Sequence, residues 1–397
     1  MKTGGTIRFG ILLLLSYCML GATFASTHIS VPFVFDGRIT MSLKVNNSEI
    51  DDIVLDTGVG QSIMLIMHEE TGRELELEYT ETQDIIRGAG TGKNKAAHLS
   101  PNVKASISSL DLGSIFTAVV AEGRQHSSHN NKGVIGGALF SSYVVEIDFD
   151  TMTLSLHDPD PFQPSDGWTE LPITLERNMP VIQASIFSDT GEEIAVKLLV
   201  DTGAQPTLAL SPEKNPKIQE PRKVIHSLSG TGLRGDTYAN KGRLPGLKIG
   251  PHRFTKVLSH FIKMVDFPPL EELPIDGLVG IGTLYRFNMI FDYSRKRMLI
   301  KPNRHASDPF EMNMAGMVIK KMGTGHTLVY HVDENTPASK IGLQKGDVIK
   351  GVNGKNIDTF DYLELKKLFE KPGAALTIQV DRDGKHTEFK LNLVRLI

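Results

Sequence analysis

Asp-Thr-Gly placed directly after an apolar run occurs twice in this 397-residue chain, once at Asp56 and once at Asp201. Each copy follows an apolar run, Ile53–Leu55 in the first case and Leu198–Val200 in the second. An aspartate placed directly after a buried strand lies where the strand turns, and the glycine permits the backbone angles of such a turn. The two copies therefore predict two similar turns, each carrying a carboxyl group.

Four further motifs recur in the same order after the two Asp-Thr-Gly copies. They are Gly90-Thr91-Gly92 and Gly230-Thr231-Gly232, Leu110–Gly113 and Leu247–Gly250, Val134–Gly136 and Leu278–Gly280, and Ile147–Phe149 and Phe291–Tyr293. The span from Asp56 to Gly136 exceeds the span from Asp201 to Gly280 by one residue. Motifs that repeat in a fixed order indicate a duplicated unit. We expect two lobes of one architecture rather than a single large β domain.

The regions around these motifs have the alternating pattern of half-buried strands. Apolar residues occupy every second position from Ile39 to Val45 and again from Ile194 to Val200, which is the period of a β-strand. We therefore predict a mainly β fold with one lobe at residues 28–158 and a second at 168–303. The segment Asp158–Trp168 is rich in proline and aspartate, which is typical of a linker.

The N-terminus has the pattern of a secretory signal peptide. Lys2 and Arg8 precede the apolar run Ile11–Leu20, and Thr23-Phe24-Ala25 offers small residues at a cleavage site. We expect residues 1–25 to be removed during export to a periplasm, a cell surface or the medium. After this removal we expect the chain to have no membrane span. The alternative is an uncleaved N-terminal anchor. Cys18 is the only cysteine, so the processed chain would contain none.

Composition excludes several classes of function. The chain has 43 Lys and Arg against 46 Asp and Glu, a net charge of −3, which gives no electrostatic footprint for nucleic acid. No cysteine or histidine pattern predicts a metal site, because His126 and His129 lie in a polar stretch typical of a solvated loop. We expect no cofactor and no metal.

Asp-Thr-Gly after an apolar strand, with an apolar-apolar-Gly motif further along, resembles the pattern of pepsin-like and retropepsin-like aspartic proteases. The lobes are more similar to the retropepsin type, in which Ala follows the motif, as Ala204 does here. The resemblance implies a catalytic pair of Asp56 and Asp201 that hydrolyses a peptide or protein substrate in a cleft between the lobes. It also implies that the glycine-containing strands Val134–Gly136 and Leu278–Gly280 brace the loops.

Other residues of the two loops and hairpins are assigned supporting roles. We expect Thr57 and Thr202 to link the loops through their hydroxyl groups, and Gly58 and Gly203 to form the turns. The glycine-rich segments are candidate flaps that approach a substrate backbone closely, with ordinary surface hairpins as the alternative. Their central residues are Gly90, Thr91, Gly92, Gly230, Thr231 and Gly232.

The chain from Met312 onward has a different pattern. Pro337–Leu343 reads as a short helix, Phe360–Phe369 as an amphipathic helix, and Asp383-Gly384 as a hairpin turn. Together with Gly346-Asp347 and Asn353-Gly354, this order resembles a PDZ domain over residues 310–397. PDZ domains bind peptides by adding a strand to a sheet edge, which implies a peptide ligand here. The loop that we assign to the terminal carboxylate, Gly323–Thr327, lacks the family's usual Gly-apolar-Gly-apolar form. A structural or lid-like role is the alternative.

Two facing carboxylates cannot both be charged. At ~3 Å and an effective dielectric of ~20, their repulsion is about 5 kcal/mol, or roughly four pKa units, so the pair shares one proton. The residue after the first Asp-Thr-Gly is Val59, where the family has Ser or Ala. Because Val59 has no hydroxyl to stabilise an ionised Asp56, we expect a pH optimum nearer neutral than that of pepsin-like enzymes.

Two other functions fit the same motifs. The chain could be a peptide-binding protein that keeps the protease fold without catalysis, with Val59 as the departure in the first lobe. It could also pair one lobe with a second copy in a homodimer, although the second Asp-Thr-Gly makes that unnecessary. The separation of the two carboxyl groups discriminates between catalysis and binding, because a dyad requires them within hydrogen-bonding reach.

Overall fold

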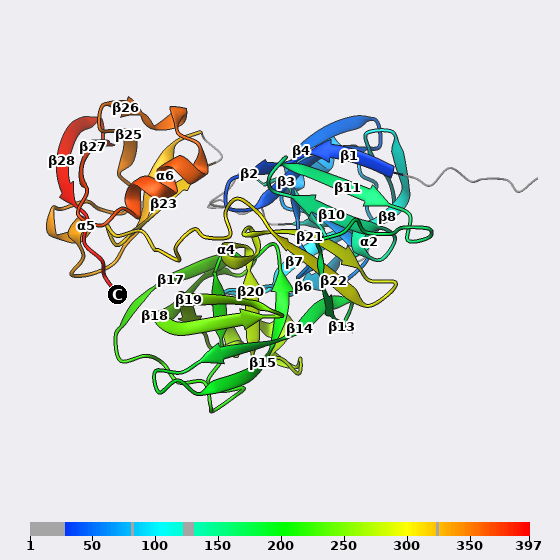
Figure 1. Ribbon diagram of the computed structural model, residues 1–397. Helices are drawn as coiled ribbons and strands as arrows, with labels where there is room; N and C mark the ends of the chain where they lie inside the picture. Colours follow the sequence, from blue (N-terminus) through cyan, green and yellow to red (C-terminus); the bar gives the residue numbers. More distant parts are fainter. Residues whose placement is uncertain (1–27, 81–82, 122–130, 323–324) are drawn as a thin grey trace, which may run out of the picture.

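The computed structural model describes residues 28–80, 83–121, 131–322 and 325–397 (Figure 1). The leader expected at residues 1–25 and the two histidines His126 and His129 lie outside this part of the chain. Among the residues described, no helix is both long and apolar enough to span a bilayer.

The first lobe is one eight-stranded sheet with the order β2-β3-β4-β9-β5-β8-β7-β6. Its strands are β2 (Val34–Phe35), β3 (Ile39–Val45), β4 (Ser48–Leu55), β5 (Ile63–Ile66), β6 (Gln83–Ile86), β7 (Lys95–Ile107), β8 (Leu110–Val120) and β9 (Gly133–Ile135). Two short helices, α1 (Glu69–Glu74) and α2 (Gly137–Phe140), belong to the same lobe. The alternating apolar residues of β3 are buried, as its period predicts.

The second lobe repeats this sheet with the order β13-β14-β15-β20-β16-β19-β18-β17. Its strands are β13 (Thr174–Glu176), β14 (Met179–Phe187), β15 (Glu193–Asp201), β16 (Leu208–Leu210), β17 (Val224–Gly232), β18 (Gly235–Ile249), β19 (His252–Phe261) and β20 (Gly277–Gly280). Its helices are η1 (Met264–Asp266), α3 (Pro268–Glu271) and α4 (Ile281–Leu284). Each strand occupies the place of its counterpart in the first lobe, so the duplication is confirmed.

A third sheet of six strands joins the lobes, with the order β1-β11-β10-β21-β22-β12. Its strands are β1 (His28–Pro32), β10 (Val144–Asp148), β11 (Thr153–His157), β12 (Thr169–Pro172), β21 (Phe287–Asp292) and β22 (Arg297–Pro302). At its centre, β10 and β21 pair antiparallel, with Glu146 opposite Ile290. The fifth repeated motif of each lobe therefore lies on the strand that meets the other lobe.

A separate sheet, two α-helices and a short 3-10 helix form the described part of the C-terminal domain, shown in orange and red in Figure 1. Its elements are β23 (Met317–Lys321), β24 (Thr327–Val332), α5 (Pro337–Lys340), β25 (Val348–Val352), β26 (Lys355–Asn356), η2 (Ile357–Thr359), α6 (Tyr362–Phe369), β27 (Ala375–Arg382) and β28 (Lys385–Asn392). The main path of the sheet is β23-β24-β25-β27-β28, which places β23 at an edge. The domain has its own apolar core, which includes Met314, Val329 and Phe369.

Local signals explain two elements of this domain. Asp383 and Gly384 both have positive φ, 53° and 81°, as the tight turn between β27 and β28 requires. The helix expected at Phe360–Phe369 begins at Tyr362. The reason is that Asp361 caps it, accepting a hydrogen bond from the Glu364 N–H at 2.7 Å.

Arg243 of β18 holds the C-terminal domain against the second lobe. Its guanidinium donates to the backbone oxygen of Ile397 at 3.1 Å and to the carbonyl of Phe310, and it pairs with the carboxylate of Glu311. Both Arg243 and Glu311 have largely covered side chains. One residue thus joins lobe two, the connecting segment and the end of the chain.

We expect Arg243→Met to loosen the C-terminal domain while the lobes stay folded. Hydrogen bonds to charged groups contribute about 1.5–3 kcal/mol, so limited proteolysis within residues 303–312 is expected to accelerate about tenfold or more. Arg253→Met, on the neighbouring strand β19, serves as the control. Equal proteolysis of the two variants would contradict this role of Arg243.

Candidate active site

The two Asp-Thr-Gly loops begin at equivalent points of the two lobes. Strand β4 ends at Leu55 and lies parallel to β9, while β15 ends at Asp201 and lies parallel to β20. A Cβ on Gly136 would lie 2.1 Å from the backbone oxygen of Asp56, and one on Gly280 would lie 2.6 Å from that of Ala204. Only glycine fits at such contacts, so each glycine-containing motif packs directly against its loop.

Reciprocal hydrogen bonds join the two loops. The N–H of Thr57 donates to Thr202 Oγ1, and the N–H of Thr202 donates to Thr57 Oγ1, both at 3.0 Å. Each hydroxyl also donates across the interface, Thr57 to the carbonyl of Val200 at 2.6 Å and Thr202 to that of Leu55 at 2.8 Å. Both threonines are buried, so these bonds are shielded from water and fix the relative position of the loops.

The carboxyl groups of Asp56 and Asp201 face each other and share a hydrogen bond. A Cβ on Gly203 would lie 2.2 Å from Asp56 Cγ, and one on Gly58 would lie 2.8 Å from Asp201 Oδ2. Each carboxyl therefore lies over the glycine of the opposite loop. The structure thus brings together all six loop residues that the sequence indicated, namely Asp56, Thr57, Gly58, Asp201, Thr202 and Gly203.

Burial and mutual repulsion make the pair retain a proton. Burial raises the pKa of Asp56, and burial together with the neighbouring charge of Asp56 raises the pKa of Asp201 further. Asp56 accepts the Gly58 N–H at 2.7 Å, and Asp201 accepts the N–H groups of Gly203 at 3.0 Å and Ala204 at 2.8 Å. The two carboxyls therefore titrate as a coupled pair that holds a proton above the ordinary aspartate range.

The sequence motifs did not identify Arg38 as a site residue. Arg38 precedes β3 and lines the same cavity as the two aspartates. Arg38 is buried, and within the described part of the chain its Nε has no hydrogen-bond partner. Burial lowers the pKa of Arg38, while the charges of Asp36, Asp56 and Asp201 act in the opposite direction. Its positive charge in turn lowers the pKa of Asp56. An arginine directly before the alternating strand Ile39–Val45 is the one signal that the sequence offers.

Val59 makes the two loops unequal. Its N–H donates to the backbone oxygen of Asp56 at 3.2 Å, whereas the equivalent N–H of Ala204 donates to the carboxyl of Asp201. Asp56 therefore lacks one of the hydrogen bonds that its counterpart receives. The Val59 side chain lines the cavity beside Asp56.

The paired carboxyls lie in a cavity of about 660 Å³ between the lobes. Apolar side chains such as Ile63, Leu99, Met179 and Leu278 form much of the wall. This size and lining suit several side chains of an extended peptide. No group of three or more His, Cys, Asp or Glu side chains able to hold a metal ion occurs in the part of the chain that the structure describes.

Two hairpins, β6–β7 and β17–β18, cover the cavity. In the second hairpin, Gly230, Thr231 and Gly232 line the cavity, as expected of a flap. In the first hairpin, the residues that line the cavity are Arg87, Gly88 and Ala89. The predicted flap residues of that hairpin, Gly90, Thr91 and Gly92, do not line it. The first Gly-Thr-Gly segment contacts the second hairpin, for example through the Gly92 N–H, which donates to the carbonyl of Arg234 at 2.8 Å. The Arg234 N–H returns a bond of 2.9 Å to the Ala89 carbonyl.

Comparisons with known proteins agree with the C-terminal assignment. The family model for the PDZ domain matches residues 309–393. Among solved structures, the chain is similar to the aspartic proteinase from Irpex lacteus, with 12% sequence identity and a TM-score of 0.43, covering 71% of this chain and 99% of that one. No curated protein matches the chain. Fold and site define a two-lobed β protein with paired Asp-Thr-Gly loops and a C-terminal PDZ domain.

We expect Thr202→Val to destabilise the protein. The variant leaves the Leu55 carbonyl and the Thr57 N–H without partners in a buried place, and each such loss costs about 1–3 kcal/mol. The free energy of unfolding, measured by urea denaturation, is expected to fall by about 2–4 kcal/mol. Thr202→Ser keeps the hydroxyl and is the matched control. Equal losses in the two variants would rule out the hydrogen bonds as the cause.

We expect Asp201→Asn to gain stability relative to wild type as pH rises. The pKa of Asp201 is raised. Its protonated carboxyl therefore stabilises the fold fully below the ordinary aspartate pKa of about 3.9, and this stabilisation is lost as pH rises through the raised pKa. Asparagine has no proton to lose there. The difference in melting temperature, variant minus wild type, is expected to increase between about pH 4 and about pH 8. A difference independent of pH would contradict the raised pKa.

Proposed function

We propose that the protein is an aspartic endopeptidase, in which Asp56 and Asp201 activate a water molecule to hydrolyse a peptide bond. The observation that carries this proposal is the pair of facing, half-buried carboxyls that line a cavity between two equivalent lobes. Both members of the pair come from one chain, so a second copy is not needed to complete it.

The two aspartates take different roles in this mechanism. Ionised Asp56 accepts a proton from the water as general base, while protonated Asp201 donates a hydrogen bond to the carbonyl oxygen of the substrate. The polarised carbonyl carbon is attacked by the water, and the proton then passes to the leaving nitrogen. The Thr57–Thr202 bonds hold the carboxyls in place through each step, which limits reorganisation.

The wall of the cavity supports a peptide substrate. Main-chain groups of Gly58, Gly203 and Gly230 lie along it, and glycines allow a bound backbone to approach closely. The two hairpins are hydrogen-bonded to each other beside the cavity, so they close this side of it over a bound substrate. Such closure sequesters the reaction from bulk water.

Replacing either aspartate tests the proposal. Asp56→Asn and Asp201→Asn are each expected to lower the rate of cleavage of unfolded casein by about a thousandfold or more, since general acid and general base each contribute factors of this order. Asp189→Asn, at an exposed turn in the second lobe, is the control. If Asp201→Asn cleaves at the wild-type rate, the dyad is not the catalyst, and a non-catalytic peptide-binding protein becomes the better description.

The pH dependence of cleavage tests the surroundings of the dyad. With Val59 beside Asp56, we expect a bell-shaped profile whose maximum lies above about pH 3. In Arg38→Met the charge that lowers the pKa of Asp56 is lost, so the acidic limb is expected to move upward by about one pH unit. Arg73→Met, on the exposed face of α1, is the control. An unchanged acidic limb in Arg38→Met, or a wild-type maximum below about pH 3, would contradict this account.

A further inference from the structure

The lysine and arginine side chains that are buried in the described part of the chain differ in what they bind. They are Arg38, Lys241, Arg286 and Lys320, and none is more than 9% exposed. Because moving a positive charge out of water is unfavourable, a buried cation is normally hydrogen-bonded or ion-paired. The partner of each side chain therefore indicates what its charge is used for.

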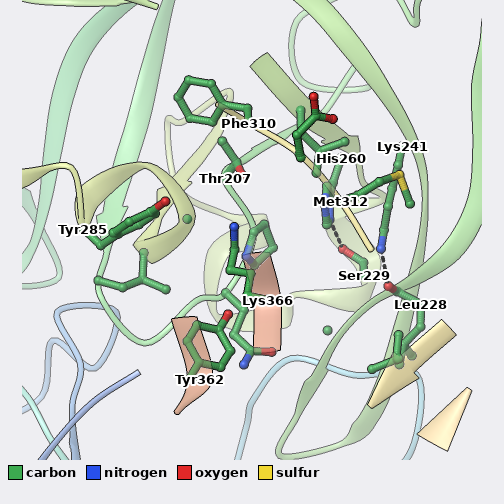
Figure 2. Close-up of a pocket in the computed structure, with 18 of the residues that line it drawn as sticks. Thr207, Leu228, Ser229, Lys241, His260, Tyr285, Phe310, Met312, Tyr362 and Lys366 are labelled. Atoms are coloured by element: carbon green, nitrogen blue, oxygen red, sulfur yellow. Dashed lines mark hydrogen bonds between the residues drawn. The ribbon is translucent and has the colours of Figure 1, made fainter. Parts of the chain in front are cut away.

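Three of these cations have partners within the protein. Lys241, Arg286 and Lys320 line a second cavity, of about 240 Å³, where the PDZ domain meets the second lobe. Figure 2 shows Lys241 donating to the Leu228 carbonyl, at a distance of 2.7 Å. Arg286 donates to backbone carbonyls, and Lys320 donates to the hydroxyl of a threonine. The donors of these three residues are therefore already in use.

Arg38 has no such partner. Its Nε is buried and accepts no bonding partner, and within the described residues its guanidinium forms neither a hydrogen bond nor an ion pair. The side chain nevertheless lines the catalytic cavity. An arginine presents its N–H donors in a planar fork that fits a carboxylate. The donors of Arg38 are therefore available to a molecule bound in this cavity.

The wall of the catalytic cavity carries more positive than negative charge. The described residues that line it include three arginines, Arg38, Arg87 and Arg177, whereas the acidic ones are the two aspartates of the dyad. A dyad that retains one proton supplies one negative charge. Arg177 is largely exposed and pairs with Glu272 outside the wall. The charge balance of the wall therefore favours an acidic ligand.

Arg38 lies near the reacting groups. The charges of Asp56 and Asp201 both act on its guanidinium, as does that of Asp36. Its backbone oxygen accepts the Asp36 N–H at 3.3 Å, at the turn that leads into β3. An extended peptide advances by about 3.3 Å per residue. A carboxylate that reaches Arg38 therefore belongs to a residue close to the bond over the dyad.

We propose that Arg38 determines specificity in the catalytic cavity, by pairing with an aspartate or glutamate side chain of the substrate close to the cleaved bond. The inference rests on the proposed function and deepens it, because it makes the substrate an acidic peptide. A charge-assisted bond formed in a cavity closed to water contributes more than one on an exposed surface. An arginine that only tuned the dyad would instead affect all substrates alike.

Cleavage of three matched peptide pools tests the proposal. The pools are acetylated decapeptide amides randomised over alanine, valine, leucine and serine, and a random position carries one glutamate, one glutamine or one lysine. At about pH 6, where glutamate is ionised, the wild type is expected to cleave the glutamate pool about threefold or more faster than the glutamine pool. The lysine pool is expected to be cleaved most slowly. Mass spectrometry of the products gives each rate and the distance of the glutamate from the cleaved bond.

Variants of the arginines assign this preference to one side chain. Arg38→Met is expected to lower the ratio of the glutamate rate to the glutamine rate to about one, whereas Arg38→Lys keeps the charge and part of the preference. The ratio within one variant is independent of any change in the dyad, which affects both pools equally. Because Arg38 forms no bond within the described protein, Arg38→Met is expected to fold, and its melting temperature verifies this. Arg177→Met, in the same cavity, is the matched control and is expected to keep the preference.

The role of Arg38 is overturned if the wild type cleaves the glutamate and glutamine pools equally. It is also overturned if the preference persists in Arg38→Met, or if Arg177→Met removes it to the same extent. Each of these results would leave hydrolysis by the dyad intact.

Binding without cleavage separates this inference from the proposed function. The full chain carrying Asp201→Asn, immobilised on beads, is expected to retain the glutamate pool about threefold or more over the glutamine pool, and Arg38→Met in the same chain to abolish this enrichment. If the wild type cleaves no pool while the enrichment is present, the dyad fails and the role of Arg38 stands. Equal retention of the two pools overturns the role of Arg38 whether or not the wild type cleaves.

Discussion

The reciprocal hydrogen bonds between Thr57 and Thr202 are the contact on which the site depends. They lie where two strands of different lobes end, and they bring the two carboxyl groups together although the residues are far apart in the chain. Because the two carboxyls would repel each other if both were charged, this link is what keeps them close enough to share a proton. Gly136 and Gly280 complete the arrangement because they let the neighbouring strands pack against the loops.

The PDZ domain is part of the same arrangement rather than a separate appendage. Lys320 of β23 donates to Thr231 Oγ1 at 2.5 Å, and the hydroxyl of Tyr330 donates to the carboxylate of Asp236 at 2.9 Å. Both partners belong to the hairpin that covers the catalytic cavity. The backbone oxygen of Asp236 also accepts from Thr91 Oγ1 at 3.2 Å. A continuous set of hydrogen bonds thus runs from the PDZ sheet to the first-lobe hairpin.

The features that could be predicted from the sequence are those encoded by short motifs. The two Asp-Thr-Gly loops, the glycines that brace them, and the turn at Asp383-Gly384 need only local information, because backbone geometry and strand period determine them. The duplication added the long-range step, since equivalent motifs occupy equivalent positions. The apolar pattern predicted that helix α6 begins at Phe360. The Asp361 cap makes it begin two residues later, at Tyr362.

The rest depends on contacts that no local pattern encodes. Arg38 lies near the aspartates because the lobe folds around it, and Gly90–Gly92 are turned toward Arg234 because the two hairpins meet. The cavity beside Lys241 exists only where the PDZ domain docks on the second lobe. Such positions follow from the packing of whole domains, so no local sequence pattern indicates them.

The central claim, that Asp56 and Asp201 share one proton, is tested most directly by carbon NMR of aspartate carboxyl groups labelled with ¹³C, assigned with the two asparagine variants. We predict two well-separated titration steps for the pair, with one proton retained at about pH 6. Two independent titrations close to the ordinary aspartate value of about 3.9 would contradict the account, because the carboxyls would then not interact.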